Sequence, residues 1–156
     1  MQSKNKGFSL IELLIVVAII LIIAAIAIPN LLRSRIAANE ASAAGSMRSV
    51  STTCMTYLSN YGGFPPSLAA LGPAGGGVPT PAAADLIDSV LASGTKSGYV
   101  FTYTPGAVVG GIVPNYTLNG DPVTVGSTGQ RHFFVDLSGV VRADPAAKAT
   151  VASTPI

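Results

Sequence analysis

The side chains of this chain that could serve as acids, bases, nucleophiles or metal ligands are few and scattered. His132 is the only histidine and stands beside Phe133 at the start of a strand-like run, where we expect a surface or edge position. No serine has a G-x-S-x-G setting, and no cysteine, histidine or carboxylate cluster has metal-ligand spacing. Asp121, Asp136 and Asp144 fall in turn-like segments, where aspartate caps the local backbone. The pattern predicts no enzyme, no bound metal and no cofactor.

Glu12 is the ionisable residue whose position most needs an explanation, because it lies inside the most apolar stretch of the chain. From Phe8 to Ile28 only Ser9 and Glu12 are polar. As a helix, these 21 residues extend about 30 Å, enough to cross the hydrocarbon core of a bilayer. Nothing downstream is large enough to wrap such a run, so we expect a helix that spans a membrane.

Basic residues flank the apolar run on both sides. Lys4 and Lys6 precede it, while Arg33 and Arg35 follow it, which is a tie under the positive-inside rule. The run is longer than the apolar region of an ordinary secretory signal, and no clean A-x-A-like cleavage site follows it, although "AAIAIPN" comes near. Composition therefore leaves the direction of the helix and the fate of the leader open.

A resemblance to a known family gives an expectation for both the direction of the helix and the fate of the leader. The leader ending in Gly7, then "FSLIELLIVVAII" and "AAIAIPN", resembles the class III signal and amino-terminal helix of type IV pilins and type II secretion pseudopilins, over residues 4 to about 36. In that family a membrane-embedded peptidase cuts after the glycine on the cytoplasmic side and methylates the new amine. The resemblance implies cleavage between Gly7 and Phe8, methylation at Phe8, and an outward-facing head. A glycine suits the scissile segment because it admits close approach to an extended backbone.

Three roles for Glu12 compete. Near the bilayer edge its carboxylate can reach water and have no function. In the first helical turn it gains about 0.3–1 kcal/mol from the helix dipole. In the family, the matching glutamate meets the terminal amine of a neighbouring subunit. Apolar helices have no preferred axial offset, so a pair about 4 Å apart, worth about 4 kcal/mol before desolvation at an effective dielectric near 20, would fix the register. We expect this register role, with Phe8 supplying the amine.

Pro29 is expected to kink the helix, because proline removes a backbone donor. Many family members have a glycine where this chain has Leu21, and that glycine and the later proline often bracket a stretch that loses regular structure in filaments. Since Leu21 is a good helix former, we expect a kink near Pro29 without unwinding.

Beyond Pro29 the pattern becomes amphipathic. Apolar residues recur every three or four positions and predict one helix face that covers a sheet: Met47, Val50, Cys54, Leu58 and Tyr61. The helix is expected to run from Phe8 to Asn60 and to end at "GGFPP".

The head is predicted to be a loop-rich domain with a small sheet. A turn-dense segment covers Gly72 to Pro81, and Asp85 is expected to cap a short helix that ends at Gly94. Strand patterns follow at 99–104, 113–118 and 132–137, and "DLSG" is expected to join the last to Val140–Arg142 in a hairpin. We predict an α+β, pilin-like fold, in which a long helix packs on an antiparallel sheet of three or four strands.

Composition limits the possible partners. Hydrophobic residues make up 49% of the chain and charged residues 10%, and the net charge of +2 comes with no basic, aromatic-interleaved patch, so we infer no nucleic acid. Cys54 is the only cysteine and cannot form an intramolecular disulfide, unlike many pilus members, which close a carboxyl-terminal loop with one. Some pseudopilins bind calcium in equivalent loops, but the aspartates here are too scattered to carry that site over.

The expected organisation is a cleaved leader (1–7), a transmembrane and filament-core helix (8–29), its amphipathic continuation (30–60) and a globular head (61–156). The resemblance implies a structural pilin that inserts in the inner membrane and polymerises into an extracellular type IV pilus. Its partners would be membrane lipid before assembly, the prepilin peptidase and methyltransferase, the inner-membrane assembly machinery and further copies of itself. Two alternatives stay open: a pseudopilin of a periplasmic type II secretion pseudopilus, and a single-pass membrane-anchored binding module.

Overall fold

The computed structural model describes residues 7–156. The first six residues of the predicted leader, Lys4 and Lys6 among them, lie outside the described residues. The chain divides into two units, Met1–Arg35 and Ile36–Ile156, and each is considered by itself below.

Helix α1 runs from Leu10 to Tyr61 and is assigned as helix without a break at Leu21 or Pro29. Leucine and alanine favour this conformation, whereas Pro29 removes one backbone donor from the ladder. The helix ends where Gly62 adopts φ +77° and donates its N–H to the Leu58 carbonyl at 2.9 Å. A glycine in this left-handed conformation is a common helix terminator.

Two short helices follow in the loop-rich part of the head. Helix η1, a 3-10 turn over Leu68–Leu71, was not predicted. Helix α2 covers Ser89–Ala92, and its cap is Asp88, whose side chain accepts the Leu91 N–H at 2.9 Å. The prediction that Asp85 caps this helix was wrong. Asp85 instead adopts φ 55°, and its N–H donates to the Gly72 carbonyl.

The sheet is antiparallel and has six strands in chain order, so the prediction of three or four was too low. Its strands are β1 (Thr95–Lys96), β2 (Tyr99–Pro105), β3 (Tyr116–Pro122), β4 (His132–Asp136), β5 (Arg142–Asp144) and β6 (Thr154–Pro155). The two outermost strands are only two residues long. Strand β3 also continues through "NGDP", which as a sequence resembles a turn, because β2 pairs with it as far as Tyr99↔Pro122.

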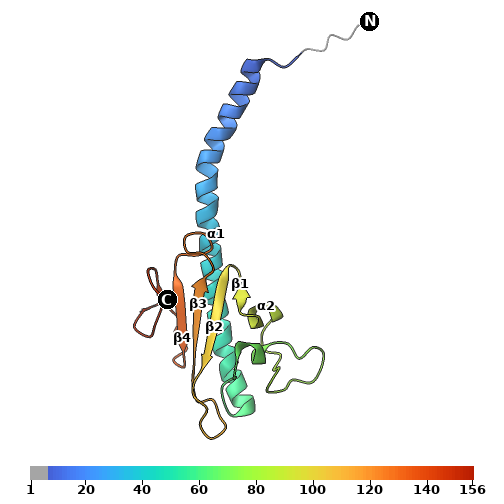
Figure 1. Ribbon diagram of the computed structural model, residues 1–156, viewed down its shortest axis with the longest axis vertical. Helices are drawn as coiled ribbons and strands as arrows, with labels where there is room; N and C mark the ends of the chain where they lie inside the picture. Colours follow the sequence, from blue (N-terminus) through green and yellow to red (C-terminus); the bar gives the residue numbers. More distant parts are fainter. Residues whose placement is uncertain (1–6) are drawn as a thin grey trace. The chain divides into compact units, whose positions relative to one another are not determined.

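The core lies between the carboxyl-terminal half of α1 and one face of the sheet (Figure 1). Met47, Val50 and Cys54 are fully buried, as the predicted helix face requires, and Leu58 and Tyr61 pack at its margin. At the centre, Gly120 lies between Phe101 of β2 and Phe133 of β4. A β-carbon on Gly120 would come within 3.3 Å of the Met47 sulfur, so glycine lets the helix approach the sheet closely.

The predicted α+β class, a long amino-terminal helix with a small antiparallel sheet, is confirmed. Regular alternation in β2 and β3 puts aromatic and aliphatic side chains on the face towards α1. The carboxyl-terminal segment partly covers the other face, where Asn119 donates to the Ala149 carbonyl at 3.1 Å.

Candidate functional site

The most unusual surface of the chain is the first part of α1. We define the apolar segment as residues 8–32, in which nearly every large side chain is exposed. Its most apolar window of 18 residues has a mean hydropathy of 3.3, and none of that window is buried. By length and composition it is a helix able to cross a membrane. Exposed apolar surface of this extent requires a lipid or protein partner.

Glu12 lies near the start of this segment and takes part in a local hydrogen-bond pattern. Its Oε2 accepts the Ser9 backbone N–H at 2.9 Å, while the Ser9 hydroxyl oxygen accepts the Ile11 N–H at 3.4 Å. The two side chains thus satisfy orphan donors at the helix start reciprocally, which is a capping box. Sequence reasoning missed Ser9, although the spacing S-x-x-E before an apolar run is the recognised signal for this motif.

Gly7 and Phe8 precede the helix. Phe8 is 80% exposed, and a β-carbon built on Gly7 would meet no atom within 4 Å. The peptide bond between them is therefore accessible in the structure. Helix capping at Ser9 keeps the ladder from extending back over these residues, as an extended protease substrate requires.

Pro29 lies inside α1, 17 positions beyond Glu12 in the sequence. The two residues are not brought together. The kink at Pro29 stays a prediction, and α1 is helical through both Leu21 and Pro29.

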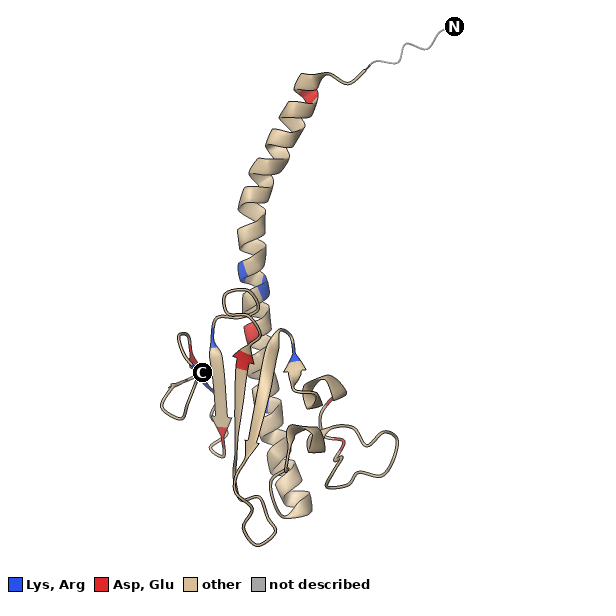
Figure 2. Cartoon of the chain, viewed as in Figure 1, with Lys and Arg blue, Asp and Glu red and all other residues tan. Residues whose placement is uncertain are grey.

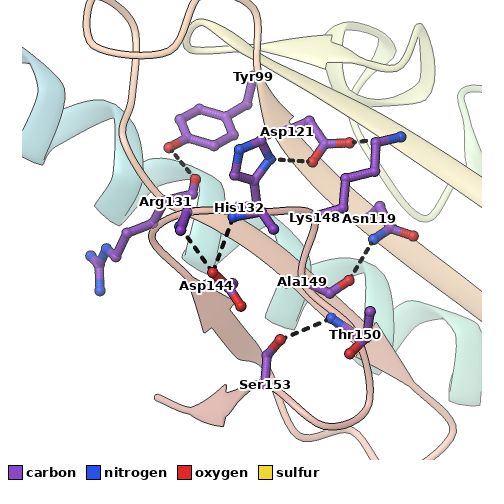
Figure 3. Close-up of polar contacts among 12 residues, drawn as sticks. Tyr99, Asn119, Asp121, Arg131, His132, Asp144, Lys148, Ala149, Thr150 and Ser153 are labelled. Atoms are coloured by element: carbon purple, nitrogen blue, oxygen red, sulfur yellow. Dashed lines mark hydrogen bonds and ion pairs between the residues drawn. The ribbon is translucent and has the colours of Figure 1, made fainter.

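A polar cluster lies on the sheet face away from α1 (Figure 3). Asp121 of β3 and Nδ1 of His132 in β4 lie 2.6 Å apart, and Lys148 Nζ lies 3.6 Å from the other Asp121 oxygen. The sequence predictions for both residues were wrong. His132 lies on an inner strand with a side chain only 15% exposed, and Asp121, inside β3, pairs with the side chains of His132 and Lys148 instead of capping local backbone.

The other two aspartates do cap local backbone. Asp136 accepts the Ser138 N–H at 2.9 Å in the predicted β-turn, and Asp144 accepts the N–H groups of Ala146 and Ala147. Among the described residues, no group of three or more histidine, cysteine, aspartate or glutamate side chains is placed to hold a metal ion.

Glu40 joins α1 to the loop before β4, and sequence reasoning missed it. Its Oε1 accepts the backbone N–H groups of Gln130 and Arg131 at 2.8 and 3.1 Å, and its Oε2 lies 2.8 Å from Arg131 Nε. Burial alone would raise the pKa of Glu40, but these backbone and guanidinium donors outweigh it and hold the pKa below its ordinary value of 4.5. Glu40 and Arg131 are 91 positions apart, so no local pattern signals the pair.

Comparison with known proteins finds a family model that covers the amino-terminal segment of the chain. Residues 2–28 match the family model of the prokaryotic N-terminal methylation motif. A type IV major pilin, PilA of Myxococcus xanthus, is 43% identical over 58 residues, which are 37% of this chain and 26% of that protein. The type IV wide pilus major component PilA4 of Thermus thermophilus is 62% identical over 39 residues, or 25% of this chain and 30% of that protein.

A type IV major fimbrial protein, FimA of Dichelobacter nodosus, is 51% identical over 59 residues, covering 35% of this chain and 37% of that protein. The matched part thus spans between about a quarter and two fifths of the curated relatives' own lengths. No solved structure matches the chain. The chain is thus similar to known proteins in sequence, and the family model matches its amino-terminal segment.

Proposed function

Because the chain carries the amino-terminal segment of the type IV pilin family, we propose that it is a structural pilin subunit, processed after Gly7 and polymerised through its apolar segment into an extracellular filament. The observation that carries this proposal is the exposed apolar segment, which holds Glu12 in the first turn of α1. Such a surface is stable in lipid before assembly and among copies of itself afterwards.

Our choice of a pilus over a secretion pseudopilus rests on the names of the relatives alone. The three described above are named as a major pilin, a wide pilus component and a major fimbrial protein. A type II secretion pseudopilin remains the alternative within the family, since it would share the same amino-terminal features. A membrane-anchored binding module is the alternative of another class, and it requires no self-assembly.

In this proposal the chain is first inserted in the membrane and later assembled into a filament. Residues 1–7 form the leader, residues 8–29 first span the inner membrane, and residues 30–60 and 61–156 supply the amphipathic helix and the head outside it. A prepilin peptidase and methyltransferase would act at Gly7 and Phe8, and the inner-membrane machinery would then add the subunit to the filament. In the filament a kink at Pro29 would redirect the helix without unwinding it at Leu21.

Glu12 is proposed to set the axial register between neighbouring subunits. The bond to Ser9 uses one carboxylate oxygen, which leaves a second oxygen to meet the terminal amine of a neighbour. In a dry bundle of leucine, isoleucine and valine, a charge pair restricts sliding in a way that apolar contacts do not.

The test separates the charge of Glu12 from its capping role. The full chain is expressed with an assembly machinery, sheared surface fibres are counted by electron microscopy, and the amino terminus is identified by mass spectrometry. Glu12→Gln retains a carbonyl acceptor for the Ser9 N–H but removes the charge. We expect it to be inserted, cleaved and methylated at Phe8, and to yield at least about tenfold fewer filaments, the equivalent of 1.4 kcal/mol.

Asp85→Asn is the matched control, because Asp85 is an exposed carboxylate in the head, and it should leave the filament yield unchanged. A normal filament yield from Glu12→Gln would contradict the register role. A mature terminus other than Phe8 would contradict the processing site, and an absence of filaments from the unmodified chain would favour the anchored module.

A further inference from the structure

The apolar segment ends abruptly at two arginines. Leu31 and Leu32 are 68% and 42% exposed, and Arg33 and Arg35 follow them directly on α1, both exposed. Ser34 stands between them and is exposed as well. Arg33 carries the first charge on the helix after Glu12 (Figure 2).

Neither arginine has a carboxylate partner along the helix. An ion pair on a helix surface needs a carboxylate three or four positions away, and no acidic residue occurs between Glu12 and Glu40. Among residues 7–156, the ion pairs involve other side chains, and neither Arg33 nor Arg35 takes part in one. Two exposed positive charges at the end of an apolar helix are thus available to bind an anion from outside the helix.

The distance along the helix matches the thickness of a membrane. Glu12 and Arg33 are 21 positions apart, which at 1.5 Å per residue is about 31 Å. The hydrocarbon core of a typical bilayer is about 30 Å thick. With Glu12 at one interface, Arg33 reaches the level of the phosphates at the other.

Arg33 and Arg35 also cover opposite sides of the helix at that level. Residues two positions apart on a helix point about 200° away from each other, to opposite sides. Arginine stems lie along apolar surface while the planar head reaches the interface, and the fork of N–H donors binds phosphate oxygens in pairs. Whichever side of the helix faces lipid, one arginine can engage a headgroup there.

We propose that Arg33 and Arg35 bind the phosphate groups of phospholipids in the outward-facing leaflet and thereby set the depth of the apolar segment before assembly. The inference rests on the membrane stage of the proposed function. It assigns to two residues of this chain a lipid-binding role and a ligand chemistry, the phosphodiester of a headgroup.

Acidic groups of a second copy are the competing occupant, and the structure favours lipid. Most carboxylates of the described head residues are already engaged, by Arg131, by Lys96, by His132 with Lys148, or by backbone N–H groups: Glu40, Asp88, Asp121, Asp136 and Asp144. In a bilayer, in contrast, the thickness of the hydrocarbon core already places the headgroup phosphates at the level of these arginines.

The experiment measures membrane depth in the full, unassembled chain reconstituted in vesicles of phosphatidylcholine and phosphatidylglycerol. A fluorophore is attached at Asn30→Cys, an exposed position one turn before Arg33, while the fully buried Cys54 stays unlabelled under native conditions. Quenching is compared between lipids that carry a nitroxide on the headgroup and lipids that carry it along the acyl chain.

With both arginines replaced, Arg33→Gln and Arg35→Gln, the probe should move about 3 Å deeper, two residues of helix rise, so that acyl-chain quenching increases and headgroup quenching falls. Arg33→Lys with Arg35→Lys should stay near the unmodified depth, because charge is retained. Arg48→Gln, an exposed arginine further along the same helix, should change nothing. In vesicles of a galactolipid, which has no phosphate, the depth difference between unmodified and double glutamine variants should disappear.

An unchanged depth in the double glutamine variant overturns the inference. If that variant keeps its depth but loses filaments, the arginines contact a second copy and the lipid role is wrong. The proposed function fails separately: insertion at normal depth without any filaments contradicts the filament, whereas no quenching by either lipid contradicts the membrane stage and the inference together.

Discussion

At the scale of single residues, Glu40 is the carboxylate with the most contacts inside the folded head. Its side chain is 9% exposed, and it holds two backbone N–H groups and the Arg131 guanidinium in one place. A carboxylate this enclosed is tolerated only because its oxygens are paired. Its value to the fold should therefore depend on its charge.

Glu40→Gln should lower the free energy of unfolding by about 1–2 kcal/mol, since the amide can still accept a backbone N–H but leaves Arg131 without its counter-charge. Arg131 is 42% exposed, and water recovers part of the loss. Urea unfolding of the full chain in detergent micelles, followed by near-ultraviolet circular dichroism, gives the number. The control is Asp88→Asn, which keeps the α2 cap and weakens an exposed pair with Lys96; a loss there as large as at Glu40 would argue against the role of burial.

The same pair predicts a pH dependence. The folded pKa of Glu40 lies below its ordinary value of 4.5, so the unfolded chain takes up the proton first as the pH falls. The stabilisation is fully present above about 4.5 and is lost as the pH drops through the folded value. The stability difference between the unmodified chain and Glu40→Gln should thus shrink below pH 4.5 in the same urea experiment, and a difference that grows there would contradict this assignment.

Which residues the sequence could reveal depends on how local their signal is. Glu12 and Gly7 stand out because a charge and a glycine border a long apolar run. Ser9 has an equally local signal and was overlooked. Glu40 meets Arg131 across 91 positions, and Asp121 meets His132 only because β3 and β4 pair in one register, so no sequence window contains either contact.

At the scale of elements, α1 has a defined beginning because of two side chains. Without the Ser9 hydroxyl, the Ile11 N–H loses its acceptor, while the Ser9 backbone N–H can still donate to the Glu12 carboxylate. The capping box therefore positions the carboxylate that we propose to work in assembly.

Ser9→Ala should raise amide hydrogen exchange at residues 10–12 by about fivefold, as expected for a lost cap worth about 1 kcal/mol. The measurement uses the full chain in micelles. Ser49→Ala, a serine exposed further along α1, should leave exchange at these amides as it was. Equal protection in both variants would mean that the helix start does not depend on Ser9.

The long elements were predictable and the short ones were not. Periodicity predicted α1, and alternation over a few residues predicted β2, β4 and the start of β3, because one buried face imposes a repeat on the sequence. Helix η1 and strands β1 and β6 are two to four residues long, too short to carry a repeat, and they exist because a neighbouring element supplies partners. Asp88, and not Asp85, caps α2 for a similar reason, since Asp85 is held by η1's end at Gly72.

At the scale of the whole molecule, the head should open cooperatively, and Cys54 can report it. The thiol is fully buried between α1 and the sheet. Burial raises its pKa to about 12, against a smaller opposing effect of the Tyr116 and Tyr103 hydroxyls. Both the inaccessibility and the missing thiolate suppress its reactivity.

A maleimide reagent at pH 8 should label Cys54 at least about a hundredfold more slowly than a cysteine placed at the exposed Ser49. Labelling should become complete once urea unfolds the head, at the midpoint seen by circular dichroism. Mass spectrometry of the full chain in micelles follows the reaction. Rapid labelling of the native chain would show that the core opens locally near Cys54.

The edge strands of the sheet limit how one head can associate with another. Its outermost strands, β1 and β6, offer two residues each, one with a lysine and the other with a proline, features that discourage a further strand from docking. In the proposed filament, neighbouring heads would therefore stay separate and would not join into a continuous β-sheet. In the proposed filament, cohesion between subunits would then come from the apolar segments and Glu12 and not from strands shared between heads.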